Sequence, residues 1–301
     1  MAHSVELVPK VNFLTFGDGS CAYRFAARRL AAQAISTKVF NLVEYYTLFG
    51  LRRELPESWR QHRAFITSPS NRRGLGYWLW KVMLIQHKLS KLDDGNILVY
   101  CDAGCELNPR LANEFTKALP SLNEDLTVFR GVFDDNVWRV CQWTNGYTIS
   151  KLDPENEFLN KPQIAAGVLF IKACPATKKL TSEWLRLALL DEYSMLVDRK
   201  GEYETPQFKD HRHDQAILSI LIYRLHSAAA LAPKFLSAQL IESPNGFFVS
   251  ARRNSGAGQQ GAEGRYSSMQ RRALVVAKTI IAKLCARFLI DQVYMIFIRW
   301  R

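Results

Sequence analysis

An alternation of strand-like and helix-like segments over about the first 225 residues constrains the fold of this chain more than any other feature. The strand-like segments are apolar runs at residues 11–16, 39–43, 97–100, 126–129 and 164–172. The helical patterns cover about residues 21–36, 77–92 and 214–225. Strands that alternate with helices favour a mostly parallel central sheet with helices on both faces. We therefore expect a doubly wound α/β fold.

One of these strands runs directly into an acidic turn. Residues 97–100 are followed by the sequence CDAGCE at residues 101–106. Asp102 is then expected at the carboxyl edge of the sheet, where open α/β folds bind their ligands, and Gly104 allows a sharp turn. A carboxylate there can hold a divalent cation or a substrate hydroxyl. The structural alternative is an Asp that opens a turn or caps the next helix.

The positive charge is concentrated at the carboxyl end. The net charge is +12, and residues 251–301 carry ten Lys and Arg against Glu263 and Asp291, which leaves 30 basic and 26 acidic side chains in residues 1–250. This near balance argues against nucleic acid as a partner, although a nucleic-acid binder that works through the tail is one alternative. We place a flexible linker at residues 251–269, which are largely small, polar and Gly-rich, and a basic amphipathic helical extension at residues 270–301.

The basic extension suits an anionic membrane surface. Residues 293–298 are apolar but too short to cross a bilayer, so we expect peripheral contact through residues 270–301. The alternative is a helix that packs on the rest of the protein with its cations outward. The amino terminus lacks the basic and then apolar pattern of a secretory signal. The expected location is therefore the cytoplasm, with peripheral attachment to the inner face of the membrane.

Several common catalytic motifs are missing. The sequence contains no G-x-S-x-G, no H-E-x-x-H and no P-loop of the form G-x-x-x-x-G-K-[ST]. It also lacks G-x-G-x-x-G after the first strand, which argues against a dinucleotide cofactor. The remaining candidates are acidic groups and turns at the ends of strands.

Four elements in a fixed order resemble the GT-A class of nucleotide-sugar-dependent glycosyltransferases. They are an amino-terminal strand with a small polar turn, the apolar strand that runs into the Asp102 turn, the Ala-Gly-Val-Leu strand around Gly167, and a helix that starts His-Asp-Gln-Ala. The resemblance covers about residues 10–225 and is strongest to bacterial enzymes that build capsule, O-antigen and other surface glycans. It implies a Rossmann-like GT-A catalytic domain at residues 1–250.

The resemblance also implies an activity. Such enzymes move a sugar from a nucleotide-diphosphate sugar, here expected to be a UDP-sugar, to a hydroxyl of a surface glycan or lipid-linked acceptor. The identity of the sugar and of the acceptor stays open, as does retention or inversion at the anomeric carbon. The alternative is a catalytically inactive protein of the same fold that only binds nucleotide sugars.

The acidic turn implies a divalent cation. In GT-A enzymes this turn is usually Asp-x-Asp, whose carboxylates hold Mg²⁺ or Mn²⁺ against the donor diphosphate. Asp102 corresponds to the first Asp, whereas Gly104 stands at the second position and Glu106 follows two residues later. The resemblance therefore implies Asp102 and Glu106 as metal ligands and the Ala103–Gly104 backbone as a donor contact. Asp102 could instead bind sugar hydroxyls, so metal dependence is open.

The segment NRRGLGYWLWK at residues 71–81 combines glycines, aromatic rings and cations. Such a segment can seat a diphosphate at a helix start. The donor-binding candidates here are Arg73, Gly76, Tyr77, Trp78 and Lys81. Of these, Arg73 and Lys81 would neutralise the diphosphate. The structural alternative is a Gly turn followed by a core helix that buries Trp78 and Trp80.

The end of the first strand is where GT-A enzymes hold the nucleoside. The corresponding residues are Thr15, Phe16, Gly17 and Asp18, and Tyr23 could stack on the base. Without the resemblance this is an ordinary strand end followed by an ordinary turn.

Two later positions complete the candidate site. Gly167 corresponds to a position that lines the sugar or acceptor pocket, although a β-bulge without function is an alternative. His213, Asp214 and Gln215 correspond to residues near the reacting sugar, with His213 as a base or metal ligand. Asp214 could alternatively act only as the cap of the following helix.

Overall fold

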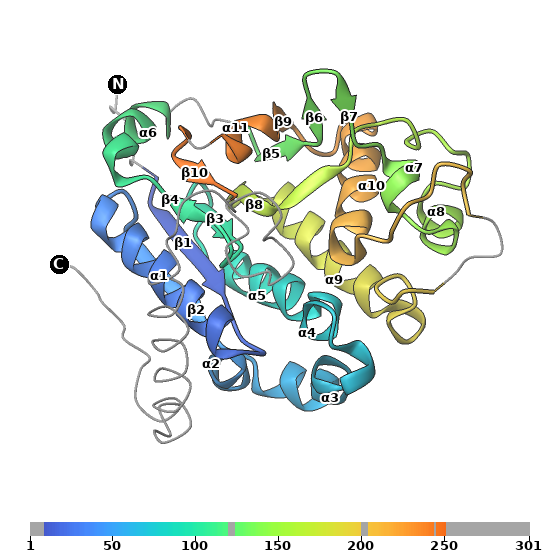
Figure 1. The fold of residues 1–301 in the computed structure, drawn as a ribbon, viewed down its shortest axis with the longest axis horizontal. Coiled ribbons are helices and arrows are strands. Elements are labelled where there is room, and N and C mark those ends of the chain that lie inside the picture. Colours follow the sequence, from blue (N-terminus) through green and yellow to red (C-terminus); the bar gives the residue numbers. More distant parts are fainter. Residues whose placement is uncertain (1–8, 120–123, 200–203, 244, 251–301) are drawn as a thin grey trace, which may run out of the picture.

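The computed structural model describes residues 9–119, 124–199, 204–243 and 245–250. The predicted linker at 251–269 and the predicted basic extension at 270–301 lie outside these residues. The fold is built on a six-stranded sheet of order β2-β1-β3-β8-β5-β9 (Figure 1). Its strands are β1 (Val11–Phe16), β2 (Leu42–Tyr46), β3 (Ile97–Cys101), β5 (Leu126–Arg130), β8 (Ile164–Lys172) and β9 (Pro233–Ser237).

The sheet is mostly parallel, as the sequence predicted. β1 pairs in parallel with β2 and β3, and β5 pairs in parallel with β9. β8 runs antiparallel to both of its neighbours, β3 and β5. The amino end of β8 therefore lies at the carboxyl edge of the other five strands. This edge brings Cys101 of β3 opposite Val168 of β8.

Helices cover both faces of the sheet. One face packs on α5 (Leu79–Ser90), α9 (Pro175–Tyr193) and α10 (His213–Ser227). The other face packs on α1 (Cys21–Thr37), α6 (Ala112–Ala118) and α11 (Gln239–Glu242). This arrangement confirms the predicted α/β class.

The other helices and short strands in the described residues complete the outline. They are α2 (Leu48–Glu54), α3 (Pro56–Thr67), α4 (Gly74–Tyr77), α7 (Val140–Trp143), α8 (Gly146–Leu152), the 3-10 turns η1 (Pro69–Asn71) and η2 (Pro109–Leu111), and the strands β4 (Glu106–Leu107), β6 (Val132–Phe133), β7 (Asn136–Val137) and β10 (Phe248–Val249). β10 pairs with β4 directly after the acidic turn. None of the helices in the described part is long and apolar enough to cross a bilayer.

Two predicted starts were wrong by two or more residues. The second strand starts at Leu42, three residues later than predicted, because Lys38 ends α1 in the left-handed region and the Asn41 side chain accepts a hydrogen bond from the backbone of Val11. The helix predicted from residue 77 starts at Leu79, because Trp78 also has left-handed backbone angles. The strands at residues 11–16 and 164–172 match their predicted bounds.

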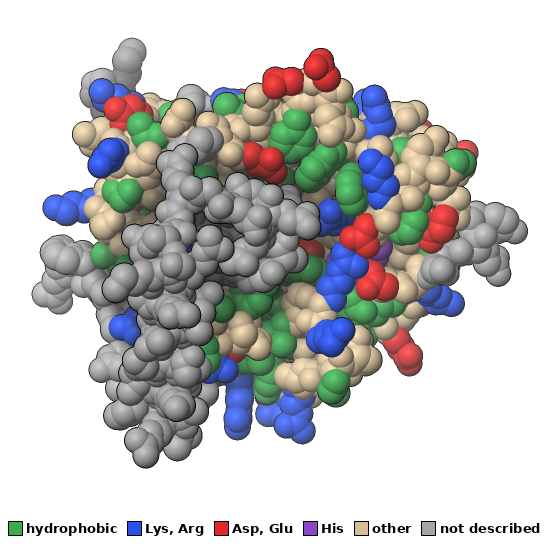
Figure 2. Space-filling model, in the orientation of Figure 1, with side chains coloured by type: hydrophobic (Ala, Val, Ile, Leu, Met, Phe, Trp, Pro, Cys, Tyr) green, Lys and Arg blue, Asp and Glu red, His purple; other side chains and the backbone are tan. Residues whose placement is uncertain are grey.

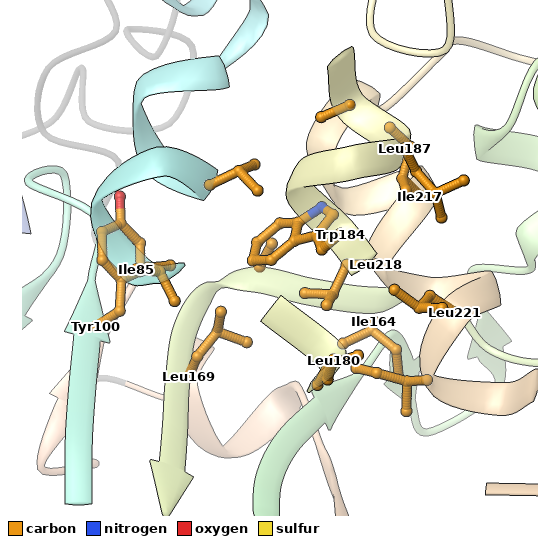
Figure 3. Packing of buried hydrophobic residues seen from close by; sticks show 14 of the residues in the cluster. Ile85, Tyr100, Ile164, Leu169, Leu180, Trp184, Leu187, Ile217, Leu218 and Leu221 are labelled. Carbon is orange, nitrogen blue, oxygen red and sulfur yellow. The ribbon is translucent and has the colours of Figure 1, made fainter. Parts of the chain in front are cut away.

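The larger core surrounds Trp184 of α9 (Figure 3). The indole is fully buried among side chains of β8, α9 and α10, and its N–H donates to the backbone carbonyl of Asp214 at 3.0 Å. The core therefore fixes the first turn of α10. On the surface, basic and acidic side chains are mixed over the face in Figure 2, as expected from the near balance of charge in residues 1–250.

Candidate active site

A buried lysine lies at the centre of the candidate site. The Lys81 ammonium in the first turn of α5 is 3.3 Å from Asp102 Oδ1 and 3.0 Å from Asp214 Oδ2, and it donates to the carbonyl of Ala166 at 3.4 Å. The Lys81 side chain is only 3% exposed. Burial favours loss of its proton, but the two carboxylates outweigh this effect and raise the pKa of Lys81. The residue therefore stays a cation.

Asp102 is the carboxylate of this group that is open to solvent. Its side chain is 37% exposed, and the Tyr100 hydroxyl donates to Oδ1 at 2.6 Å. The Asp102 amide donates to the carbonyl of Gly167 at 2.8 Å, and the Cys105 amide closes a turn onto the Asp102 carbonyl at 2.9 Å. Asp102 thus opens a turn, as the structural alternative required, and also presents an oriented carboxylate at the sheet edge.

Asp214 is the buried carboxylate of the group. It lies within the first turn of α10 rather than at the N-cap, which is Arg212, so the helix-cap alternative is not what the structure shows. Burial raises the pKa of Asp214 to about 6, although Lys81 acts in the opposite direction. The 3.0 Å contact with Lys81 is an ion pair without hydrogen-bond geometry. Asp214 is 3% exposed, and its role near the reacting sugar stays a prediction.

Gly167 makes room for Asp102. A Cβ atom at Gly167 would lie 3.2 Å from Asp102 Oδ2, a contact tight enough to push the carboxylate. The pairing of β8 with β5 also shifts register next to this position, between Val128 and Phe129. The strand irregularity is therefore present, and the lining of a sugar or acceptor pocket by Gly167 stays a prediction. Gln215, the neighbour of Asp214, accepts a hydrogen bond from the Ala166 amide at 3.4 Å.

The Gly-rich segment before α5 has unusual backbone angles. The φ angles of Gly74, Leu75, Gly76, Tyr77 and Trp78 are all positive, between 51° and 79°. Each non-Gly residue in this region costs about 1–3 kcal/mol and needs support from its surroundings. Added Cβ atoms would lie 2.2 Å from the Trp78 ring at Gly74 and 2.5 Å from the Cα of a helix α3 residue at Gly76. These glycines therefore permit close contacts within the protein.

The two tryptophans of residues 71–81 lie in different surroundings. The Trp78 ring lies 5.9 Å from the Lys81 ammonium and 5.5 Å from the His213 ring. Trp80 is buried and stacks on Phe16 of β1 with ring centres 3.8 Å apart. The structural alternative holds for Trp80, whereas Trp78 borders the candidate site.

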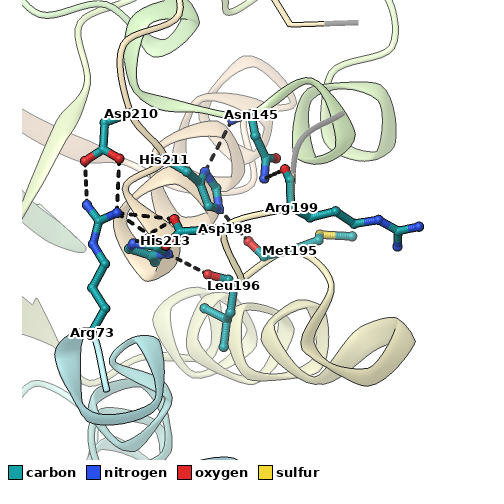
Figure 4. A network of polar contacts seen from close by, with 9 residues as sticks. All are labelled: Arg73, Asn145, Met195, Leu196, Asp198, Arg199, Asp210, His211 and His213. Atoms are coloured by element: carbon teal, nitrogen blue, oxygen red, sulfur yellow. Dashed lines mark hydrogen bonds and ion pairs between the residues drawn. The ribbon is translucent and has the colours of Figure 1, made fainter. Parts of the chain in front are cut away.

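Arg73 belongs to a second polar network (Figure 4). It pairs with Asp210 through both terminal nitrogens, one contact being 3.0 Å, and with Asp198 at 3.2 Å. Its charge is therefore already matched by two carboxylates. Its binding to a diphosphate stays a prediction.

His213 lies 3.7 Å from Asp198 of this network and precedes Asp214 in the chain. Its Nδ1 lies 2.6 Å from the carbonyl of Leu196, which fixes Nδ1 as the protonated nitrogen. Burial and the neighbouring His211 lower the pKa of His213 to about 3. His213 is thus neutral at physiological pH and 1% exposed, so a role as proton acceptor stays a prediction.

The end of β1 offers one exposed ring. Thr15 and Phe16 are buried, and a Cβ at Gly17 would lie 2.2 Å from the backbone oxygen of Tyr23, so Gly17 permits α1 to approach the strand. The Asp18 carboxylate accepts hydrogen bonds from two backbone amides and an arginine side chain. Tyr23 is 42% exposed. The structure thus leaves Tyr23 accessible for stacking, while nucleoside binding by this strand end stays a prediction.

Of the two carboxylates predicted as metal ligands, the structure places Asp102 next to the Lys81 ammonium. Within the described ranges, no group of three or more His, Cys, Asp or Glu is placed to hold a metal ion. Glu106 lies in β4, with Oε1 3.8 Å from a terminal nitrogen of Arg29. Metal binding by Asp102 and Glu106 stays a prediction.

Arg29 of α1 was not predicted as a site residue. One of its terminal nitrogens donates to the carbonyls of Ala103 at 3.1 Å and of Cys105 at 2.8 Å. The Arg29 side chain thus holds the turn that carries Asp102. No local pattern marks this arginine, because its contacts are with residues far along the chain.

Solved structures similar to the chain include several glycosyltransferases. A glycosyltransferase involved in glycosylation of the major capsid of PBCV-1 matches with a TM-score of 0.41 and 10% identity, over 82% of this chain and 98% of its own. Mouse xyloside xylosyltransferase 1 matches with 0.39 and 12%, over 76% and 85%. The glycosyltransferase GlyE of Streptococcus pneumoniae TIGR4 matches with 0.37 and 12%, over 81% and 55%. No protein-family model and no curated protein sequence matches the chain.

Proposed function

We propose that the protein transfers a sugar from a nucleotide-diphosphate sugar, with a UDP-sugar as the expected donor, to a hydroxyl group of a surface glycan or lipid-linked acceptor. The observation that carries this proposal is the Lys81 ammonium, which joins the open Asp102 to the buried Asp214 at the carboxyl edge of the sheet. Ligands of open α/β sheets bind at this edge. The order of motifs in the sequence supports the same activity.

The proposed reaction exchanges one bond for another. The bond between the anomeric carbon and the diphosphate oxygen breaks, and its electron pair leaves with the nucleoside diphosphate. The acceptor oxygen forms the new bond to the anomeric carbon, and its proton is released to solvent. Asp102 would accept hydrogen bonds from sugar hydroxyls, and Lys81 would keep this carboxylate oriented and charged. Gly167 would leave the space in which the sugar meets Asp102.

The charge of the centre supports a role for a cation. Two carboxylates face one ammonium, so the group is net negative when all three are charged. A donor diphosphate adds further negative charge. We propose that Asp102 holds Mg²⁺ or Mn²⁺ together with diphosphate oxygens, since Mg²⁺ is often bound by one or two carboxylates and substrate phosphates. When bound, the cation would stabilise the leaving diphosphate.

The test is turnover of a panel of UDP-sugars with and without Mn²⁺. We expect hydrolysis or transfer with at least one donor, and a loss of about 10²-fold or more for Asp102→Asn, comparable to removal of an electrostatic stabiliser. Glu155→Gln is a matched control, because Glu155 is exposed. The proposal fails if no nucleotide sugar binds or turns over, with wild type and Asp102→Asn behaving alike.

Membrane contact is proposed from the sequence alone. Residues 251–301 carry ten basic and two acidic side chains, which suits an anionic surface and a lipid-linked acceptor. We expect the full chain to bind vesicles that contain phosphatidylserine and to be released by high salt. Equal binding to neutral vesicles would argue against an electrostatic contact.

A further inference from the structure

The turn that carries Asp102 is held from two sides. On one side the Asp102 amide donates to Gly167 of β8 at 2.8 Å. On the other side Arg29 donates to the carbonyls of Ala103 and Cys105 at 3.1 and 2.8 Å. These two carbonyls flank Gly104, whose lack of a Cβ leaves its backbone the fewest conformational restrictions in the turn. The backbone on both sides of Gly104 is thus fixed by a side chain from α1.

The chemistry of this contact suits an arginine. The guanidinium group is planar and always charged, and a single terminal nitrogen can donate to two carbonyls while the other approaches a carboxylate. Here the second terminal nitrogen lies 3.8 Å from Glu106 Oε1. The Arg29 side chain is 33% exposed, so it is partly covered by the turn that it holds. A lysine also has donors for two carbonyls, but it lacks the second nitrogen that approaches the carboxylate.

The carboxylate in the turn and the one that follows it face different cations. Asp102 faces Lys81, whereas Glu106 faces Arg29. Arg29 therefore also contacts Glu106, whose role as a metal ligand stays a prediction. The same arginine holds the turn on both sides of Gly104 and lies next to the carboxylate that follows it.

We propose that Arg29 is a positioning residue of the active site, which fixes the Asp102 carboxylate through the carbonyls of Ala103 and Cys105. This inference rests on the proposed transferase function. Arg29 does not touch the reacting atoms; it limits the motion of the turn. A displacement of about 1 Å at a reacting group can cost about 10²-fold in rate. A loosened turn therefore lowers kcat more than it changes donor binding.

The experiment compares Arg29→Ala with Arg28→Ala in the full chain. Arg28 is the exposed neighbour on the same helix, so it controls for loss of a cation from α1. For UDP-sugar turnover we expect kcat to fall by about 10- to 100-fold in Arg29→Ala, with KM nearly unchanged and with partial recovery when free guanidinium ion is added below denaturing concentrations. Arg29→Lys, which keeps donors for two carbonyls, should recover part of the loss, and Arg28→Ala should match wild type.

A second measurement tests whether Arg29 holds the turn, independently of the activity. Amide hydrogen exchange at residues 103–105 should be about tenfold or more faster in Arg29→Ala, while exchange within β3 stays as in wild type. Unchanged exchange at the turn would overturn the proposal, whether or not the protein is a transferase. Equal kcat in Arg29→Ala and wild type would also overturn it. Faster amide exchange at the turn, in a protein that neither binds nor turns over any nucleotide sugar, would confirm that Arg29 holds the turn and refute the transferase function.

Discussion

Replacement of Lys81 by Met tests the charge arrangement of the site most directly. The methionine side chain has a similar length and fills the space, but the ammonium that faces Asp214 at 3.0 Å is lost. Opposite unit charges at this distance attract by about 5 kcal/mol at an effective dielectric constant of about 20. Removal of one partner of a buried pair typically costs about 3–5 kcal/mol, because the other charge stays buried without compensation.

Asp214 can avoid this cost only by taking up a proton. Its pKa is raised to about 6 with Lys81 present, and Lys81 acts to lower it, so the variant must have a higher value. A carboxyl group whose pKa is raised by folding stabilises the protein below the pKa of the unfolded chain, about 4. This stabilisation is lost as the pH rises through the pKa of the folded state. Wild type stops losing stability from Asp214 near pH 6. The variant continues to lose about 1.4 kcal/mol per pH unit above this point.

The assay is urea unfolding at several pH values from 5 to 8. We expect the difference in unfolding free energy between wild type and Lys81→Met to grow from about pH 6 upwards. The double variant Lys81→Met/Asp214→Asn carries no buried charge at this position, so it should be more stable than the single variant at pH 8 and lose the extra slope. A difference that stays constant from pH 6 to 8, or a double variant as unstable as the single one, would refute the reasoning.

Three further changes probe other parts of the structure. Gly167→Ala places a Cβ 3.2 Å from Asp102 Oδ2. It should lower UDP-sugar turnover about tenfold with little loss of stability. Unchanged kinetics would argue against the proposal that Gly167 leaves the space in which the sugar meets Asp102. Trp184→Ala removes a fully buried indole and should cost about 3–5 kcal/mol in urea unfolding; a cost below about 1 kcal/mol would contradict its central place. Burial alone would raise the pKa of Glu54, but three neighbouring basic side chains lower it to about 2. Glu54→Gln should therefore cost about 1 kcal/mol at neutral pH, and this difference should disappear as the pH falls from about 4.5 towards 2.

Local patterns predicted the order of elements and the place of Asp102. Periodicity and β-branched runs are properties of short segments, so the strands at residues 11–16 and 164–172 could be delimited without tertiary information. The same holds for the strand that leads into the acidic turn. A carboxylate that follows a buried strand must lie at a sheet edge, and this reasoning placed Asp102 correctly.

Contacts between distant segments were not accessible to the same reasoning. The sequence marked Lys81 and Asp214 separately, but their pairing depends on how α5 and α10 pack. The direction of β8 could not be predicted either, because an apolar run reads the same for a parallel and an antiparallel buried strand. Arg29 carries no motif that marks it as a partner of the acidic turn; only its hydrogen bonds show this.

The antiparallel strand also has a consequence for biosynthesis. β8 joins the group β2-β1-β3 to the pair β5-β9, so until it pairs, β3 has a neighbour on one side only. Ribosomes complete residues 97–101 well before residues 164–172. During that interval a fully apolar strand presents an open edge, which is a template for pairing with another nascent chain. The strand that brings Gly167 to Asp102 is therefore also the one that ends this aggregation-prone stage of synthesis.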